Sequence, residues 1–376
     1  MSAKDEDSAS GLRNTVGTRD SMVTCGKTQT VRNVERVPKK GDIDVSRDRD
    51  SQVSSGEAER AKEFKAFIYP AEKLGVEIEY PNGLTIESLA NLKHVVDGSH
   101  SNIFKCTFSG LPVIVKTIRQ RSMSNKVALN EYKMECALLT RLAHCNVVQL
   151  LGMGKFVARN GKERPFMVLE KLEGGTLQYV LNRKTFSTML GRPALSQLRC
   201  VEIALQLCRA LQYLHEDFST EAVLIHRDLK PDNIGFDSVG VLKVIDFGLC
   251  TCVPRVYGSD SVYKMTGNTG SLRYMAPEVA RNETYSEKVD VYSVGIIMWQ
   301  MLTGRMPYEN MGKEDHRQRV CMNDERPLLE KSFDVTLKDI MVQAWSPLHA
   351  QRPKASELAL RLDTFIKVTH HRTDLN

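Results

Sequence analysis

Residues 226–233 read His226-Arg227-Asp228-Leu229-Lys230-Pro231-Asp232-Asn233. This short stretch brings a carboxylate, an amine and a carboxamide close together. Groups of these kinds accept a proton, neutralise developing negative charge and bind a hard metal ion. Because one short stretch can arise by chance, the segments that follow it along the chain decide its meaning.

Two further motifs follow this stretch. Asp246-Phe247-Gly248 comes first, and Ala276-Pro277-Glu278 comes after it. The three motifs have the order and approximate spacing that a protein kinase requires. From roughly residue 85 to residue 367, the sequence therefore resembles the protein kinase superfamily, of the serine/threonine type.

Later segments resemble the tyrosine-kinase-like branch of that superfamily, whose members mostly phosphorylate Ser or Thr. They are residues 290–295, Trp345 and Gln351-Arg352-Pro353. Lys230 favours the same substrate class, because an amine two residues after the catalytic Asp resembles serine/threonine kinases rather than tyrosine kinases.

The resemblance implies an α+β, bilobal protein-kinase-like fold. The small β-rich N-lobe, with one main helix, is expected over residues 85–172, and the larger, mainly α-helical C-lobe over 173–367. The apolar pattern agrees with it. Strands are expected around a small-residue turn near residues 95–104 and along the buried run 113–115. Helices are expected over 126–143, 196–215 and 290–303.

The two ends of the chain differ from the rest. Residues 1–60 are rich in Ser, Asp, Arg, Lys and Gly and have almost no aromatic residues. Such a composition buries too little surface to offset the entropy of ordering, so we expect a disordered polar tail. Residues 61–84 are expected to form an extension that can pack on the kinase domain, and residues 368–376 a C-terminal tail.

Composition narrows the possible partners and compartment. Lys and Arg outnumber Asp and Glu by 52 to 46, but they are dispersed, so nucleic-acid binding is not indicated. The longest apolar run lies within residues 291–302 and is too short to span a bilayer. The nine cysteines are scattered without zinc-site spacing. We therefore expect an intracellular, cytoplasmic protein without a membrane span.

The resemblance assigns the catalytic roles. Asp228 corresponds to the catalytic base, which accepts the proton of the substrate hydroxyl. Lys230 would neutralise charge on the transferring phosphoryl group. Asn233, also in the catalytic set, and Asp246 would supply oxygen ligands to Mg²⁺. Lys116 would reach the phosphates of ATP, in an ion pair with Glu135.

The resemblance also places other residues around ATP. They belong to the nucleotide-covering loop, the adenine pocket and the hinge between the lobes. These residues are Val96, Gly98, Ile103, Ile114, Leu169, Glu170 and Leu172.

The nucleotide-covering loop departs from the family pattern. The family reads G-x-G-x-x-G, whereas residues 96–101 keep only the central Gly98. Side chains at the other two positions restrict the backbone where the loop must approach the phosphates, so we expect weaker ATP binding. Ile114 is larger than the usual residue above the adenine, and Gly235 is smaller than the usual residue below it. We expect the two changes to compensate.

Other residues are expected to support or regulate the site. Glu278 should pair with Arg352, and Ser271 should contact both Asp228 and Lys230. Arg227 could receive a phosphate that an upstream kinase places on the segment between Asp246 and Glu278. The candidate acceptors are Ser259, Ser261, Tyr263, Thr266 and Thr269.

The retained polar residues favour an active kinase that transfers the γ-phosphate of ATP to Ser or Thr of protein substrates in intracellular signalling. One alternative is a pseudokinase scaffold that binds nucleotide or partners without efficient transfer, because the loop has lost glycines and the adenine pocket is altered. A small-molecule phosphotransferase is a further alternative. Residues 276–278 and Ser271, which build a peptide-docking platform in the family, argue against it.

Overall fold

The computed structural model describes residues 84–158, 161–183, 193–256 and 261–374. The predicted polar tail and nearly all of the predicted extension lie outside the described residues. Of that extension, only Leu84 is described, and it forms a bridge to Gly154.

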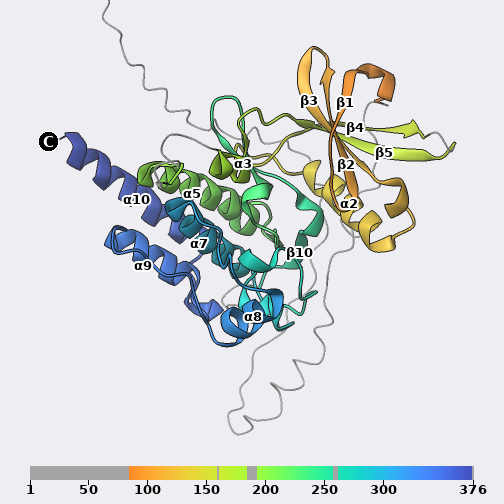
Figure 1. The fold of residues 1–376 in the computed structure, drawn as a ribbon. Coiled ribbons are helices and arrows are strands. Elements are labelled where there is room, and N and C mark those ends of the chain that lie inside the picture. Colours follow the sequence, from red (N-terminus) through yellow and green to blue (C-terminus); the bar gives the residue numbers. More distant parts are fainter. Residues whose placement is uncertain (1–83, 159–160, 184–192, 257–260, 375–376) are drawn as a thin grey trace, which may run out of the picture. The chain divides into compact units, whose positions relative to one another are not determined.

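The N-terminal part of the described chain is a five-stranded antiparallel sheet with the strand order β1-β2-β3-β5-β4 (Figure 1). The strands expected near residues 95–104 and 113–115 are confirmed. A tight turn with positive φ at Ser109 and Gly110 joins β2 to β3. The strands are β1 (Leu89–Asp97), β2 (Ser101–Phe108), β3 (Leu111–Ile118), β4 (Leu150–Val157) and β5 (Glu163–Glu170).

Helix α2 (Lys126–Leu139) packs beside this sheet and ends earlier than the expected residue 143. The regular pattern breaks after Leu139, because the Ala137 carbonyl accepts from the Thr140 hydroxyl at 2.8 Å and the N–H of Arg141 donates to Leu138 at 2.9 Å. Beyond this turn, the N–H of Ala143 donates to the Tyr213 hydroxyl at 3.0 Å, and the His144 ring stacks on Tyr213. Leu142 is buried all the same, which is why its spacing resembled a longer helix.

The rest of the described chain is mainly helical (Figure 1). Helix α7 is buried along nearly its whole length, because 15 of its 16 residues lie in the interior, and it contacts α5 and α9. Helix α10 continues past residue 367, where we expected the domain to end, since no Gly or Pro interrupts it. The helices are α3 (Leu177–Asn182), α5 (Gln197–Gln212), α6 (Pro277–Ala280), α7 (Lys288–Thr303), α8 (Lys313–His316), α9 (Val335–Ala344) and α10 (Ala355–Asp374).

Short strands frame the polar motifs. The motif of residues 226–233 leaves β7 and enters β8, and Asp246 follows β9 by two residues. These strands are β6 (Gly175–Thr176), β7 (Ala222–Ile225), β8 (Ile234–Phe236), β9 (Leu242–Val244) and β10 (Thr251–Pro254). Single 3-10 or π turns complete the fold at Ile86–Ser88, Gln120–Ser122, Tyr213–Asp217, Pro231–Asn233, Phe247–Leu249, Leu272–Tyr274, Arg317–Met322 and His349–Gln351.

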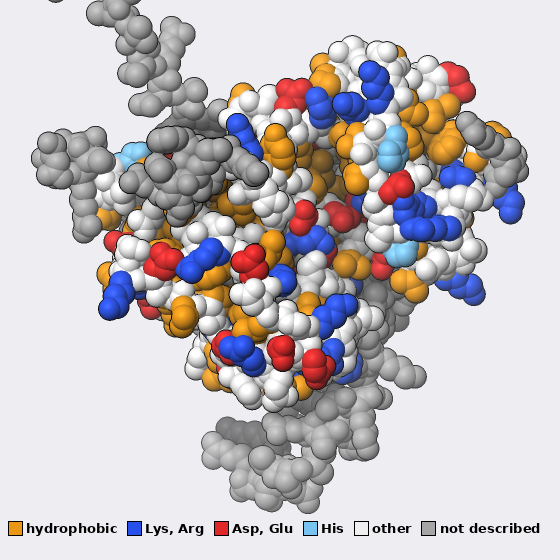
Figure 2. All heavy atoms as spheres, viewed as in Figure 1, with side chains coloured by type: hydrophobic (Ala, Val, Ile, Leu, Met, Phe, Trp, Pro, Cys, Tyr) orange, Lys and Arg blue, Asp and Glu red, His pale blue; other side chains and the backbone are white. Residues whose placement is uncertain are grey.

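Two apolar clusters hold these elements together. The smaller one lies within the sheet, and the larger one runs from α2 and β5 through the helical part. No helix in the described part of the chain is long and apolar enough to cross a membrane. On the face seen in Figure 2, Lys and Arg side chains alternate with Asp and Glu over both lobes.

Candidate active site

The carboxylate of Asp228 is held by three donors. Lys230 Nζ donates to its Oδ2 at 2.6 Å, and the backbone N–H of Ser271 donates to its Oδ1 at 2.8 Å. Asn233 Nδ2 donates to Oδ2 at 3.1 Å. Lys230 also donates to the Ser271 hydroxyl at 3.0 Å, so the expected contacts of Ser271 are confirmed. These three hydrogen bonds fix the orientation of the Asp228 carboxylate.

A glycine lets the segment of residues 270–271 approach the catalytic loop this closely. Gly270 has a φ of +99°, and a Cβ atom there would lie 2.4 Å from the carbonyl oxygen of Arg227. A side chain at this position would therefore push Ser271 away from Asp228.

Asn233 and Asp246 offer the oxygen atoms that Mg²⁺ prefers. The amide nitrogen of Asn233 donates to Asp228 twice, to its carbonyl oxygen at 2.8 Å and to its carboxylate at 3.1 Å. The side-chain carbonyl of Asn233 is thus the group available to a ligand. Asp246 has a left-handed backbone, with φ of +64°, and its side chain is 47% exposed. The donor set fits a hard divalent cation.

Lys116 lies between two carboxylates. Its Nζ is 2.7 Å from Glu135 on α2 and 2.9 Å from Asp246. Burial alone would lower the pKa of Lys116, but the charges of Asp246 and Glu135 outweigh burial and hold that pKa above its usual value. The charge of Lys116 in turn holds the pKa of Asp246 below its usual value, against the effect of burial. The predicted Lys116–Glu135 pair is confirmed.

Asp290 supports the catalytic loop from within α7. Its carboxylate accepts the backbone N–H of His226 at 2.8 Å, that of Arg227 at 2.9 Å and His215 Nε2 at 2.9 Å. Burial acts to raise the pKa of Asp290, but these hydrogen bonds and the nearby histidines hold it below its usual value. Arg227 keeps a φ of +67°, a strained conformation that these bonds help to maintain.

The predicted Glu278–Arg352 pair is also confirmed. Arg352 Nη1 and Nη2 contact the two carboxylate oxygens of Glu278 at 2.5 and 2.9 Å. Both side chains are almost fully buried. This bidentate pair joins residues 276–278 to the start of α10 and is structural rather than catalytic.

The polar residues of both lobes face one cavity of about 300 Å³. Lys116, Asp228, Lys230 and Asp246 line it. Among the further lining residues that were not assigned to the site from the sequence are His100, Glu131 and Tyr132. The signal for Glu131 was its position one helical turn before Glu135. The signal for His100 was its place in the loop that had lost its glycines.

The other residues assigned to ATP come from the sheet and the hinge. Ile103 of β2 pairs with Val96 on one side and with Lys116 on the other. Ile114 pairs with Leu169, which is buried, while Ile114 is partly buried. Gly98 closes the β1–β2 turn. None of these residues lines the cavity that contains Asp228.

The hinge residues have roles of their own in the structure. The Glu170 carboxylate accepts the N–H of Gln149 at 2.8 Å and lies 3.2 Å from Lys243 Nζ. Leu172 occupies the space beside Gly235, since a Cβ atom on Gly235 would lie 2.4 Å from Leu172 Cδ1. The space left by the small Gly235 is therefore filled from the hinge. The expected compensation of side-chain volume between Ile114 and Gly235 therefore involves Leu172 as a third residue.

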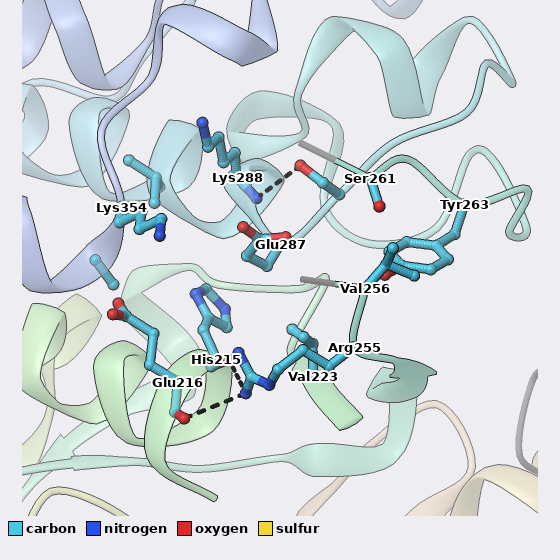
Figure 3. Close-up of a pocket in the computed structure, with 13 residues that line it drawn as sticks. His215, Glu216, Val223, Arg255, Val256, Ser261, Tyr263, Glu287, Lys288 and Lys354 are labelled. Carbon is cyan, nitrogen blue, oxygen red and sulfur yellow. Dashed lines mark hydrogen bonds between the residues drawn. The ribbon is translucent and has the colours of Figure 1, made fainter. Parts of the chain in front are cut away.

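A larger cavity, of about 460 Å³, lies elsewhere in the helical part (Figure 3). Figure 3 shows His215, Glu216, Arg255, Glu287 and Lys354 around it. The Arg255 guanidinium donates to the backbone carbonyls of His215 at 2.7 Å and Glu216 at 3.2 Å. This cavity shares no lining residue with the cavity of Asp228, so size alone does not identify the site of chemistry.

The fold and the site together define a class of protein, one with a two-lobed, kinase-like fold in which a Lys–Glu–Asp cluster faces an Asp–Lys–Asn loop. Comparison with protein families agrees. Residues 89–361 match the family described as protein kinase domain. This match covers most of the chain, so the chain belongs to the protein kinase family.

Individual relatives are named accordingly. The serine/threonine-protein kinase VIK of Arabidopsis thaliana is 34% identical over 276 residues, covering 73% of this chain and 59% of that protein. The serine/threonine-protein kinase STY46 of the same plant is 31% identical over 296 residues, covering 77% of this chain and 47% of that protein. The serine/threonine/tyrosine-protein kinase HT1 is 31% identical, covering 71% of this chain and 64% of that protein. The chain thus spans about half to two thirds of the length of these relatives.

Proposed function

We propose that this protein is an ATP- and Mg²⁺-dependent serine/threonine kinase that phosphorylates protein substrates in intracellular signalling. One observation supports this most directly. Lys116, Asp228, Lys230 and Asp246 face a single cavity, and the ion pair of Lys116 with Glu135 is formed. The pseudokinase scaffold is not favoured, because the chain retains all the polar groups that the transfer requires.

In this proposal Asp228 accepts the proton of the substrate hydroxyl, since three donors fix its carboxylate. Lys230, beside it, neutralises negative charge on the transferring group. Asn233 and Asp246 hold Mg²⁺ through oxygen atoms. ATP supplies the γ-phosphoryl group, and bound Mg²⁺ offsets the charge of its phosphates.

The adenine would lie between the sheet and the hinge. Ile114 and Leu169 form its wall on the sheet side, and Leu172 its wall on the hinge side. The backbone N–H of Leu172 donates to no backbone oxygen in the described ranges, which leaves it for the base. Glu170 stays engaged with Gln149 and Lys243, so its side chain positions the hinge rather than contacting ATP.

A second cavity beside the catalytic loop supports a polypeptide substrate. It measures about 380 Å³ and shares Lys230 and Ser271 with the catalytic array. Leu272, Met306 and Met311 line its walls. A segment of extended chain whose hydroxyl reaches Asp228 would place its neighbouring residues against this surface.

Phosphorylation of the segment between Asp246 and Glu278, the activation segment, by an upstream kinase is part of the proposal. Among the candidate acceptors, Ser259 lies outside the described residues. Thr266 is exposed, and its hydroxyl accepts a hydrogen bond from Arg227 Nη1 at 2.8 Å. A phosphate on Thr266 would therefore meet a guanidinium already in place. A Thr266→Ala variant should lose activation by phosphorylation. Unchanged activity in a chain with all five acceptors replaced would refute this regulation.

We place the protein in a reducing, cytoplasmic compartment. The seven buried cysteines of the described ranges are free thiols, which supports this assignment.

The experiment that tests the function uses the purified chain and its Asp246→Ala variant. Each is incubated with Mg²⁺, ATP and a generic basic protein, and phosphosites are mapped by mass spectrometry. Phosphate on Ser and Thr that depends on Asp246 is the expected result. Asp217→Ala, at an exposed Asp outside the site, is the matched control. Absence of phosphate, with ATP still raising the melting temperature, would establish the scaffold instead.

A further inference from the structure

The loop between β1 and β2 places His100 at the cavity that Asp228 lines, where the phosphates of ATP are expected. The histidine lines this cavity together with Lys116 and Asp246. The family pattern has glycines on either side of this loop, where the present chain has Val96 and Ser101. The loop therefore approaches the phosphates with an imidazole at its tip and with less freedom in its backbone.

The backbone of the loop is closed on itself. The N–H of Gly98 donates to the carbonyl of Ser101 at 2.8 Å, and the N–H of Arg119, directly after β3, donates to the carbonyl of His100 at 2.8 Å. At least one N–H of the loop is thus already used within the turn. A side-chain N–H at the tip of the loop can bind a phosphate oxygen in place of a backbone N–H that is already used.

A buried hydroxyl orients the imidazole. His100 Nδ1 lies 3.2 Å from the Oγ of Ser122, which is only 3% exposed. We assign the Ser122 hydroxyl as the donor to Nδ1, an arrangement in which Nε2 carries the ring hydrogen and is itself a donor. The ring is half-buried, so its orientation is set before any ligand binds.

The charges around the cavity call for a further donor. Both ammonium groups that line it are already paired, Lys116 with Glu135 and Asp246, and Lys230 with Asp228. Glu131 adds another acidic side chain to the lining. A polyphosphate entering this space meets more carboxylates than ammonium groups, and a fixed N–H donor offsets part of that repulsion.

We propose that His100 Nε2 donates a hydrogen bond to a phosphate oxygen of ATP and so takes over part of the role of the missing glycines. This inference rests on the proposed function, because it concerns the nucleotide of that same site. It makes His100 a nucleotide-binding residue in addition to Lys116.

The test measures binding rather than turnover. Dissociation constants for Mg²⁺–ATP and for adenosine are determined by calorimetry for the wild-type chain and for His100→Phe, which keeps a ring but lacks the donor. Removing a hydrogen bond to a charged group should weaken ATP binding by about tenfold or more. Adenosine binding should stay unchanged, because adenosine carries no phosphate. His100→Gln, which restores an N–H donor at nearly the same reach, should recover most of the affinity for ATP.

A matched control is His94→Ala, at a histidine of the same lobe that is half exposed and outside the cavity. If His100→Phe binds ATP as tightly as the wild-type chain, His100 has no role in binding, and the proposed kinase function stands. Equal weakening of ATP and adenosine would mean that His100 only shapes the loop, which also refutes the proposal. A wild-type chain that binds neither compound would refute both this role and the kinase function.

Discussion

Single residues in this protein act through partners that are distant in sequence. Asp228 is fixed by Ser271, and the backbone of residues 226 and 227 is fixed by Asp290. Because three motifs resemble a known family, the contact of Ser271 with Asp228 could be named from the sequence, whereas the contacts of Asp290 emerge from the structure. The Lys116–Glu135 and Glu278–Arg352 pairs, expected from that resemblance, are present in the structure.

The buried pair of Glu278 and Arg352 gives a prediction about stability. Replacing Glu278 by Gln leaves the Arg352 guanidinium buried without its charge partner, which should cost about 3–5 kcal/mol of unfolding free energy. The measurement is urea denaturation of the wild-type chain, Glu278→Gln, Arg352→Met and the double variant. The double variant should be more stable than the sum of the single changes implies, because it leaves no unpaired buried charge.

An exposed pair serves as the comparison. Lys155 and Glu163 lie 3.3 Å apart with side chains 47% and 66% exposed. Lys155→Ala should change stability by less than about 1 kcal/mol. A loss in Glu278→Gln as small as the loss in Lys155→Ala would contradict the buried-charge argument.

At the scale of elements, α2 shows how a short helix is positioned to carry a functional residue. Its first turn has no acidic residue, and its N-terminus relies on Asn125, whose side chain accepts the N–H groups of Val127 and Ala128 at 3.0 and 3.2 Å. The other end of α2 carries Glu135, which reaches Lys116. Stability of the first turn thus bears on the site three turns later.

Loss of this cap should be measurable. Asn125→Ala removes the acceptor for two backbone N–H groups and should destabilise the protein by about 1 kcal/mol. Chemical denaturation measures the effect. Asn125→Asp keeps an acceptor and adds a negative charge near the helix N-terminus, so it should be at least as stable as the wild-type chain. Equal destabilisation by Ala and Asp would show that the cap does not hold α2.

The sequence predicted which helices and strands exist better than it predicted where they end. The helix expected over residues 126–143 ends at Leu139, because the N–H of Arg141 donates to Leu138 instead of to Ala137. Hydrophobic periodicity predicts that Leu142 is buried, but it does not distinguish a helix from a turn at that position. Likewise, the filling of the Gly235 space by Leu172 depends on how the hinge folds over β8, which no local pattern encodes.

At the scale of the whole molecule, buried ionisable groups should tie stability to pH. His316 in α8 is buried, and burial together with the charges of Arg273 and Arg326 lowers its pKa to about 4, from 6.5. Below about pH 6.5 the unfolded chain takes up a proton that the folded chain does not bind until about pH 4. The contribution of His316 is therefore present above pH 6.5 and is lost as the pH falls toward 4.

The check compares melting temperatures at about pH 7.5 and about pH 5. His316→Phe, which keeps a ring against Tyr308, should lose less stability on acidification than the wild-type chain. His371→Phe, at an exposed histidine, is the control and should follow the wild-type chain. A wild-type chain and His316→Phe that lose stability in parallel would rule out this role of His316.

One ammonium group joins the two lobes inside the active site. Lys116 comes from β3 and is bound by Glu135 of the N-lobe and Asp246 of the C-lobe. Moving the lobes apart would break the contact with Asp246 and leave the contact with Glu135 intact. Assembly of the site and closure of the lobes are therefore the same event. The environment of Lys116 Nζ reports on both, so a single isotope-labelled lysine would suffice to follow whether this protein is open or closed.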